Sequence, residues 1–261
     1  MTQRRTVGVD VPRVQPRSIG DEVAARLEKL IVVGDLKPGD RLPSERELAI
    51  GLNVSRASLR EAMHELEAKH LIERRPGRGT TVLPAPEHVT SLYAKVSGKE
   101  REVREVAELR EAVEPRLARY AAVRATDANL IALTDVLAEA DGEISQELSL
   151  RLDLEFHLLV AQAADSALMA SLITLMASWT KSTRELSHAT VHARNASYRG
   201  HREILDAINA RDGDAAEAAM TAHLVEVSVL TRANLRRRRG DSNVRAASDP
   251  DQPRSARKAR T

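Results

Sequence analysis

"LKPGDRLPSERELAIGLNVSRASLREAMHELEAKHLIERRPGRGTTVL", residues 36–83, alternates helix-forming runs with turn residues. Ser44, followed by Glu47 three positions later, has the pattern of a capping box and predicts the start of one helix. Ser55 is the expected N-cap of the next helix, which should end near Lys69. The runs LIERR and TTVL, joined by PGRG, indicate a hairpin, because glycines accept the positive φ angles of a tight tip.

A further helix is expected upstream of this stretch, from Ile19 to Val33, ending at Gly34. Helix, turn, helix and hairpin in this order predict a winged helix-turn-helix. In the third helix, Arg56 lies at the edge of the apolar face and Arg60 lies off it, so both can reach phosphates or guanine edges in a major groove. The alternative is a three-helix interaction module with solvated arginines, and the hairpin favours the winged fold.

The motifs of residues 18–83 closely resemble the DNA-binding domain of the GntR family of bacterial transcription regulators. The similarity includes the whole stretch quoted above and runs without a visible gap. The resemblance implies a double-stranded DNA partner. It also implies which residues contact the DNA, namely Arg46, Arg56, Ser58, Arg60 and Gly77, with Arg78 as a weaker candidate.

The rest of the chain divides by composition. Residues 1–17 lack periodicity and are expected to form a disordered arm, and residues 84–101 begin with prolines and are interpreted as a linker. Residues 102–236 contain one helical pattern after another, which predicts an all-α bundle of six or seven helices in a mostly α protein. Residues 237–261 are arginine-rich and are expected to form a disordered basic tail.

The composition excludes several kinds of protein. The 261 residues include no cysteine, so disulfides and thiolate metal sites are excluded. No apolar run reaches about 18 residues, and no charged start precedes an apolar stretch, so we expect neither a membrane span nor a signal peptide. The expected location is therefore cytoplasmic.

One predicted helix of the bundle, around residues 149–164, carries two polar residues in the middle of its apolar side. These are Asp153 and His157, four positions apart and therefore roughly 40° apart on the helix. Both should point into the bundle. A buried carboxylate without a partner is costly, so Asp153 needs a cation or hydrogen-bond donors.

Two histidines on later helices follow the same pattern. His201 and His223 each lie on the apolar face of a predicted helix. We exclude His188 and His192 from this set, because charged and polar residues surround them in the helical pattern.

Three histidines and one aspartate that converge in a dry bundle predict a divalent-metal site. Imidazole and carboxylate suit Zn, Ni, Mn or a similar ion, and the resulting positive centre can accept a carboxylate from a ligand. The alternative is a set of separately buried histidines, each hydrogen-bonded to a neighbour, with Asp153 salt-bridged to an arginine.

Residues 102–230 resemble the helical effector-binding domain of the FadR subfamily, called the FCD domain. The stretches that carry this resemblance are ELREAVEPRLARYAA, LDLEFHLLVAQAADSALM and HREILDAINARDGDAAEAAMTAHL. The resemblance implies that the metal ligands are Asp153, His157, His201 and His223.

The same resemblance makes Arg110 a candidate to face the carboxylate of an effector, although a structural or solvated arginine fits its motif equally. One departure concerns Asp165 and Ser166, which stand where relatives commonly have Gly-Asn. The identity of the effector therefore cannot be carried over by analogy.

These observations predict a metabolite-responsive transcription regulator that binds a small organic acid through its metal ion. Relatives of this type dimerise, which implies a homodimer on a palindromic operator. One alternative is a metal-dependent helical-bundle enzyme fused to a DNA-binding domain, for which the sequence offers no H-E-x-x-H or nucleophile motif. The other is a sequence-nonspecific DNA-architectural protein, which only the basic tail supports.

Overall fold

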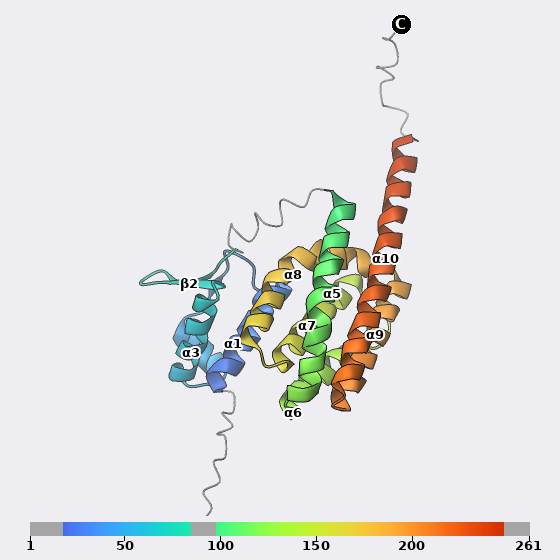
Figure 1. Cartoon of the computed structure of the whole chain (residues 1–261). Coiled ribbons are helices and arrows are strands. Elements are labelled where there is room, and N and C mark those ends of the chain that lie inside the picture. Colours follow the sequence, from blue (N-terminus) through green and yellow to red (C-terminus); the bar gives the residue numbers. More distant parts are fainter. Residues whose placement is uncertain (1–17, 85–97, 248–261) are drawn as a thin grey trace, which may run out of the picture. The chain divides into compact units, whose positions relative to one another are not determined.

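The computed structural model describes residues 18–84 and 98–247 (Figure 1). The chain divides into two compact units, with the boundary between Pro84 and Ala85. The expected arm over residues 1–17 and most of the expected linker lie outside the described residues.

The first unit has the elements of a winged helix-turn-helix: α1 (Ile19–Val33), β1 (Arg41–Leu42), α2 (Glu45–Gly51), α3 (Arg56–Ala68), β2 (Ile72–Arg75) and β3 (Gly79–Val82). Side-chain caps begin its helices as predicted. Ser44 Oγ accepts the Glu47 N–H at 3.3 Å, and the Ser44 N–H donates to Glu47 Oε2 at 2.9 Å. Ser55 Oγ accepts the Ser58 N–H at 3.0 Å and so caps α3.

A three-stranded antiparallel sheet completes this unit. Strand β3 is central, between β1 and β2, and the tip between β2 and β3 has positive φ at Gly77 and Gly79. The core joins α1, α3 and the sheet through Leu27, Leu59, Met63, Leu66, Ile72 and Val82. The predicted winged helix-turn-helix is confirmed.

The second unit is a helical bundle. Its described helices are α5 (Lys99–Arg124), α6 (Asp127–Glu139), α7 (Gln146–Ala163), α8 (Ala167–Ser187), α9 (Val191–Asn209) and α10 (Gly213–Ala247). Helices α5 and α10 lie side by side, and α9 also packs on α10 (Figure 1). Among the helices of both units that the structure describes, none combines the length and apolar character needed to cross a bilayer.

Helix α7 lies at the centre of the bundle. It contacts α5, α6, α8 and α9, and its large apolar side chains Leu152, Phe156 and Leu158 are at most 2% exposed. A polar side chain on this helix is therefore close to several other helices and far from water.

Two expected boundaries are wrong. Helix α10 continues to Ala247, so residues 237–247 are helical rather than part of a disordered tail, and α5 already begins inside the expected linker. Arginine has a high helix propensity, and α10 packs along α5, where Arg239 forms an ion pair with Glu100. A basic composition therefore did not oppose helix formation here. Residues 248–261 lie outside the described residues.

Candidate metal centre

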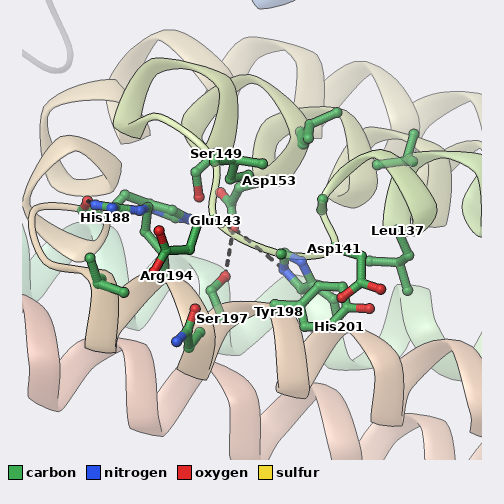
Figure 2. Close-up of a pocket in the computed structure, with 17 residues that line it drawn as sticks. Leu137, Asp141, Glu143, Ser149, Asp153, His188, Arg194, Ser197, Tyr198 and His201 are labelled. Atoms are coloured by element: carbon green, nitrogen blue, oxygen red, sulfur yellow. Dashed lines mark hydrogen bonds and ion pairs between the residues drawn. The ribbon is translucent and has the colours of Figure 1, made fainter.

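A cavity of about 540 Å³ is enclosed by α6, α7, α9 and the segment that joins α6 to α7 (Figure 2). Its wall includes Asp153 and His201, two of the predicted metal ligands. Ser197 faces both of them and donates to Asp153 Oδ1 at 3.3 Å. The cavity thus gives a small molecule a route to the predicted ligands.

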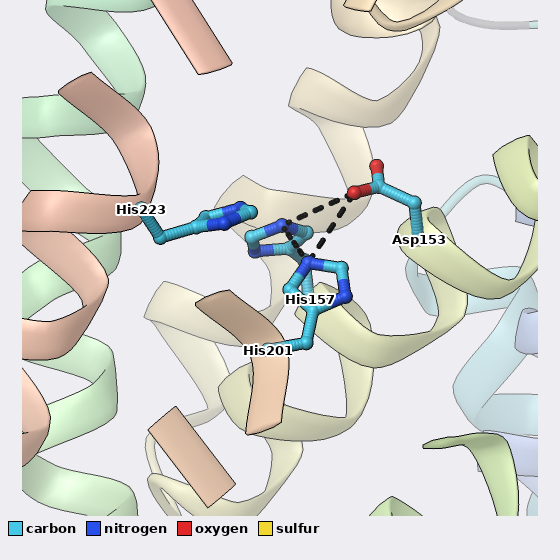
Figure 3. A group of neighbouring side chains, drawn as sticks. All are labelled: Asp153, His157, His201 and His223. Atoms are coloured by element: carbon cyan, nitrogen blue, oxygen red, sulfur yellow. Dashed lines mark hydrogen bonds and ion pairs between the residues drawn. The ribbon is translucent and has the colours of Figure 1, made fainter. Parts of the chain in front are cut away.

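The four predicted ligands converge on one point (Figure 3). Asp153 and His157 come from α7, His201 from α9 and His223 from α10. All four are buried, with exposed fractions between 2% and 4%, and their candidate ligand atoms lie within 4.8 Å of one another. The sequence reasoning therefore selected side chains that the fold brings together.

The distances inside this cluster suit a small divalent ion. His201 Nε2 lies 3.3 Å from His157 Nε2 and 3.4 Å from Asp153 Oδ1, and His157 Nε2 lies 3.7 Å from Asp153 Oδ1. Bonds of about 2.0–2.1 Å from zinc to nitrogen and oxygen place neighbouring ligand atoms of a tetrahedral site roughly 3.3 Å apart. These three atoms therefore need little movement to share an ion.

The protonation states also suit ligation, since a metal ion needs neutral imidazoles and an ionised carboxylate. Burial lowers the pKa of His201 to about 4 and holds that of His223 well below its usual range. Burial raises the pKa of Asp153, but the Arg184 guanidinium outweighs this effect and holds the pKa well below its usual value. At neutral pH the cluster therefore offers free imidazole lone pairs beside a carboxylate.

The position of His223 depends on Gly200 in α9. A Cβ atom at Gly200 would lie 2.5 Å from His223 Nδ1 and 3.1 Å from His223 Cγ, so the imidazole occupies the space that a side chain would fill. The other ring nitrogen, Nε2, is buried and has no hydrogen-bond partner among the described residues. Such an orphaned acceptor is costly unless something binds it, and a metal ion fits.

Arg110 and Glu114, one turn apart on α5, support His157. Arg110 donates to Glu114 Oε1 at 2.7 Å, and Glu114 Oε2 lies 2.7 Å from His157 Nδ1, within ion-pair distance but not aligned as a hydrogen bond. An Arg110 Nη2 atom lies 2.9 Å from His157 Nε2. Because a guanidinium can only donate, His157 Nε2 carries the lone pair, and the proton of the neutral ring is on Nδ1, towards Glu114.

Arg184 on α8 completes the cluster as the partner of Asp153. Its Nη1 atom donates to Asp153 Oδ2, and its Nε atom donates to Thr180 Oγ1 at 3.1 Å. With neutral histidines, the charges of Arg110 and Arg184 balance those of Glu114 and Asp153. The alternative in which Asp153 pairs with an arginine is thus present, but the histidines are clustered rather than separate.

Two regions of the chain match known protein families. Residues 19–82 match the model described as "Bacterial regulatory proteins, gntR family", and residues 105–226 match the FCD domain. The HTH-type transcriptional regulator LutR of Bacillus subtilis (strain 168) is 35% identical over 210 residues, which cover 76% of this chain and 94% of LutR. The chain belongs to the GntR family.

This GntR-family protein is also similar to the HTH-type transcriptional repressor NanR of Enterobacter sp. (strain 638). The two are 31% identical over 236 residues, 85% of this chain and 90% of that repressor. The solved structure of Streptococcus agalactiae GntR covers 80% of this chain and 98% of its own, with 29% identity and a TM-score of 0.50. The expected family is confirmed, and the protein is a transcription regulator with an FCD effector-binding domain.

The residues of this GntR regulator that were predicted to contact DNA lie on α2, α3 and the wing. Arg46, Arg56, Arg60, Gly77 and Arg78 are exposed. Arg60 is held by Glu45, with 3.1 Å between Nε and Oε2. Ser58 is half-buried, and its hydroxyl lies 2.9 Å from that of Ser55 at the N-terminus of α3. Their contact with DNA remains a prediction.

The structure adds residues that sequence patterns missed. His188 was excluded for its polar neighbours, yet it is 1% exposed, with Nε2 3.6 Å from Asp153 Oδ1. Its Nδ1 atom is engaged by Ser187 Oγ and the Arg184 carbonyl. The polar residues that argued against burial include Arg184 itself, which is buried against Asp153. A buried carboxylate that requires a cation was the one signal that could have found Arg184.

The predicted effector residue and the departure from the family pattern lie apart from the cavity. Arg110 is buried in its pair with Glu114 and does not line the cavity. Asp165 and Ser166 do not line it either. Asp165 adopts the left-handed conformation, with φ of 47°, which glycine adopts easily and aspartate tolerates.

Proposed function

We propose that this GntR-family regulator holds one divalent metal ion in its helical unit and senses a small organic acid through it. The residues that would hold the ion are Asp153, His157, His201 and His223. The observation that carries the proposal is their convergence from three helices, with His223 Nε2 buried and unpartnered. The regulator is expected to act in the cytoplasm as a homodimer.

The charge balance of the buried cluster favours an anionic effector. Two arginines and two carboxylates cancel when the histidines are neutral. A divalent cation adds two positive charges in a site that water does not reach, where charge is costly unless it is compensated. When bound, the ion supplies a coordination position that a carboxylate can take. Binding of an organic acid therefore restores part of the charge balance.

The proposed response is a shift between arrangements of the two winged units. An effector that binds one arrangement more tightly changes the affinity for DNA by the same coupling free energy. A two-fold dimer reads two half-sites related by the same symmetry, so we expect a palindromic operator. The regulators LutR and NanR support this proposal over an enzymatic role.

Metal analysis and thermal unfolding test the proposal. Protein purified without chelator should contain about one equivalent of Zn, Ni, Mn or a similar ion. A chelator should lower the melting temperature, since a bound ion stabilises the folded state. His157→Ala should abolish both the metal content and the chelator effect, whereas His192→Ala, which changes an exposed histidine on α9, should preserve both. Wild-type protein that binds none of these ions while remaining folded would refute the metal site.

A further inference from the structure

The wall of the cavity beside Asp153 and His201 carries polar groups that nothing in the protein satisfies. The side chains of Asp141, Glu143, Ser149, Asn195 and Tyr198 line it. None of these five side chains has a hydrogen bond or ion pair with another described residue. They are therefore available to a bound molecule.

Ser149 is the most informative of these groups. It lies on α7 one turn before Asp153, is only 7% exposed, and points into the cavity beside Asp153 (Figure 2). A buried hydroxyl without a partner costs free energy, and a ligand hydroxyl within the cavity would remove that cost. The polar side of this cavity thus extends inward from its exposed rim to the metal ligands.

The charges on the wall favour one kind of ligand. Asp141 and Glu143 lie on the segment between α6 and α7 and are exposed, so both are ionised at neutral pH. The cation on this wall, Arg194, already donates to the His188 carbonyl at 3.2 Å. A second carboxylate on the ligand would meet these two anions, whereas hydroxyl groups could donate to them.

We infer that the cavity binds a polyhydroxylated acid with a single carboxylate, such as a sugar acid, rather than a fatty acid or a dicarboxylic acid. The inference rests on the proposed function, since the carboxylate end would lie at Asp153 and His201. The hydroxylated end would then lie against Ser149, Asn195 and Tyr198, with Asp141 and Glu143 accepting its outermost hydroxyls. The cavity has room for a six-carbon chain.

Four six-carbon acids test this inference by isothermal titration of the zinc-loaded protein. Gluconate has five hydroxyls and one carboxylate, hexanoate lacks the hydroxyls, glucarate adds a second carboxylate, and adipate has two carboxylates without hydroxyls. We expect gluconate to bind most tightly, by roughly five-fold for each hydrogen bond that hexanoate cannot form. Hexanoate, adipate or glucarate binding more tightly than gluconate would overturn the inference and leave the proposed function intact.

Variants of the wall separate recognition from a structural role. Asp141→Asn combined with Glu143→Gln should reduce the preference for gluconate over glucarate, because it removes the repulsion of the second carboxylate. Ser149→Ala should weaken gluconate binding several-fold and leave hexanoate binding unchanged. The matched control, Glu203→Gln with Asp206→Asn, removes two exposed charges from α9 outside the cavity wall and should change neither preference.

The outcomes are distinct. An unchanged preference in the Asp141 and Glu143 variant would show that these residues do not select the ligand, and would overturn the inference. If none of the four acids binds, the inference also fails. If the protein in addition takes up no metal ion, the proposed function fails with it.

Discussion

Gly200 acts in this protein through the side chain that it lacks. The next residue, His201, is a predicted ligand, and the missing Cβ of Gly200 leaves the space in which the ring of His223 lies. One position of α9 therefore supplies an imidazole while its neighbour admits another from α10. A ligand set can thus depend on a residue that could never bind a metal.

Gly200→Ala should therefore reduce metal affinity by displacing His223. A Cβ atom at 2.5 Å from His223 Nδ1 cannot be accommodated without movement of the ring. The cobalt-substituted protein reports this directly, because loss of one imidazole changes its visible absorption spectrum. We expect weaker binding and an altered spectrum.

A control and a double variant distinguish this effect from general destabilisation. Gly213→Ala, where a Cβ would face the flexible Arg119 side chain at 3.2 Å, should retain the wild-type spectrum. In a His223→Ala background, Gly200→Ala should destabilise the fold much less, because the clashing ring is gone. A wild-type spectrum and affinity in the Gly200 single variant would contradict this account.

At the scale of elements, α3 combines two functions on different faces. Leu59, Met63 and Leu66 are fully buried in the core of the winged unit, whereas Arg56 and Arg60 are exposed near the start of the helix. Arg60 is held by Glu45 of α2, and Arg56 has no side-chain partner among the described residues. The helix can therefore lose either arginine without losing its packing.

Arg56→Ala and Arg60→Ala should each weaken operator binding by about 1–3 kcal/mol if each arginine makes a bidentate base contact. Fluorescence anisotropy with operator DNA, at one fixed salt concentration, measures this change. Arg104→Ala, an exposed arginine on α5, is the control and should bind the operator as the wild type does. Wild-type affinity for either α3 variant would remove that residue from the recognition surface.

The whole molecule combines two units whose stability should respond differently to solution conditions. The winged unit has an aliphatic core of its own, whereas the helical unit buries two arginines, two carboxylates and four histidines around one point. Titration of these buried groups links the stability of the helical unit to pH. The metal-free protein should show this link most clearly.

The free energy of unfolding of the chelated protein should fall as the pH decreases from 6.5 towards 4. Burial lowers the pKa of His201 to about 4, so in this window the unfolded chain binds a proton that the folded chain does not. Each such histidine contributes a slope of up to about 1.4 kcal/mol per pH unit. The lowered pKa of His223 adds to the slope, and the lowered pKa values of Asp153 and Glu114 extend the loss below their ordinary pKa values.

Urea unfolding at pH 7.5, 6.0 and 5.0 measures this slope. His201→Ala should flatten it by about one proton, because the variant lacks the group that the folded state keeps neutral. His192→Ala removes an exposed histidine and should keep the wild-type slope. Equal slopes for wild type and His201→Ala would mean that His201 titrates alike in both states.

The sequence by itself determined the order of the elements and the helix faces. Caps and turns are local, so Ser44, Ser55 and the wing glycines predicted the helix-turn-helix and its hairpin within a few residues. Helical periodicity is also local, and it placed Asp153, His157, His201 and His223 on inward faces. Resemblance to the FCD family joined them into one site, which the fold then brought together.

Only the tertiary structure decided what surrounds that site. Glu114, Arg184 and His188 lie on α5, α8 and the end of α8, and nothing in their own helical patterns relates them to Asp153 or His157. Arg184 is a polar residue in its local pattern, and it is buried because the carboxylate of Asp153 on α7 compensates its charge. The partner of a buried charge comes from another helix, so packing decides its position and a single helical pattern cannot reveal it.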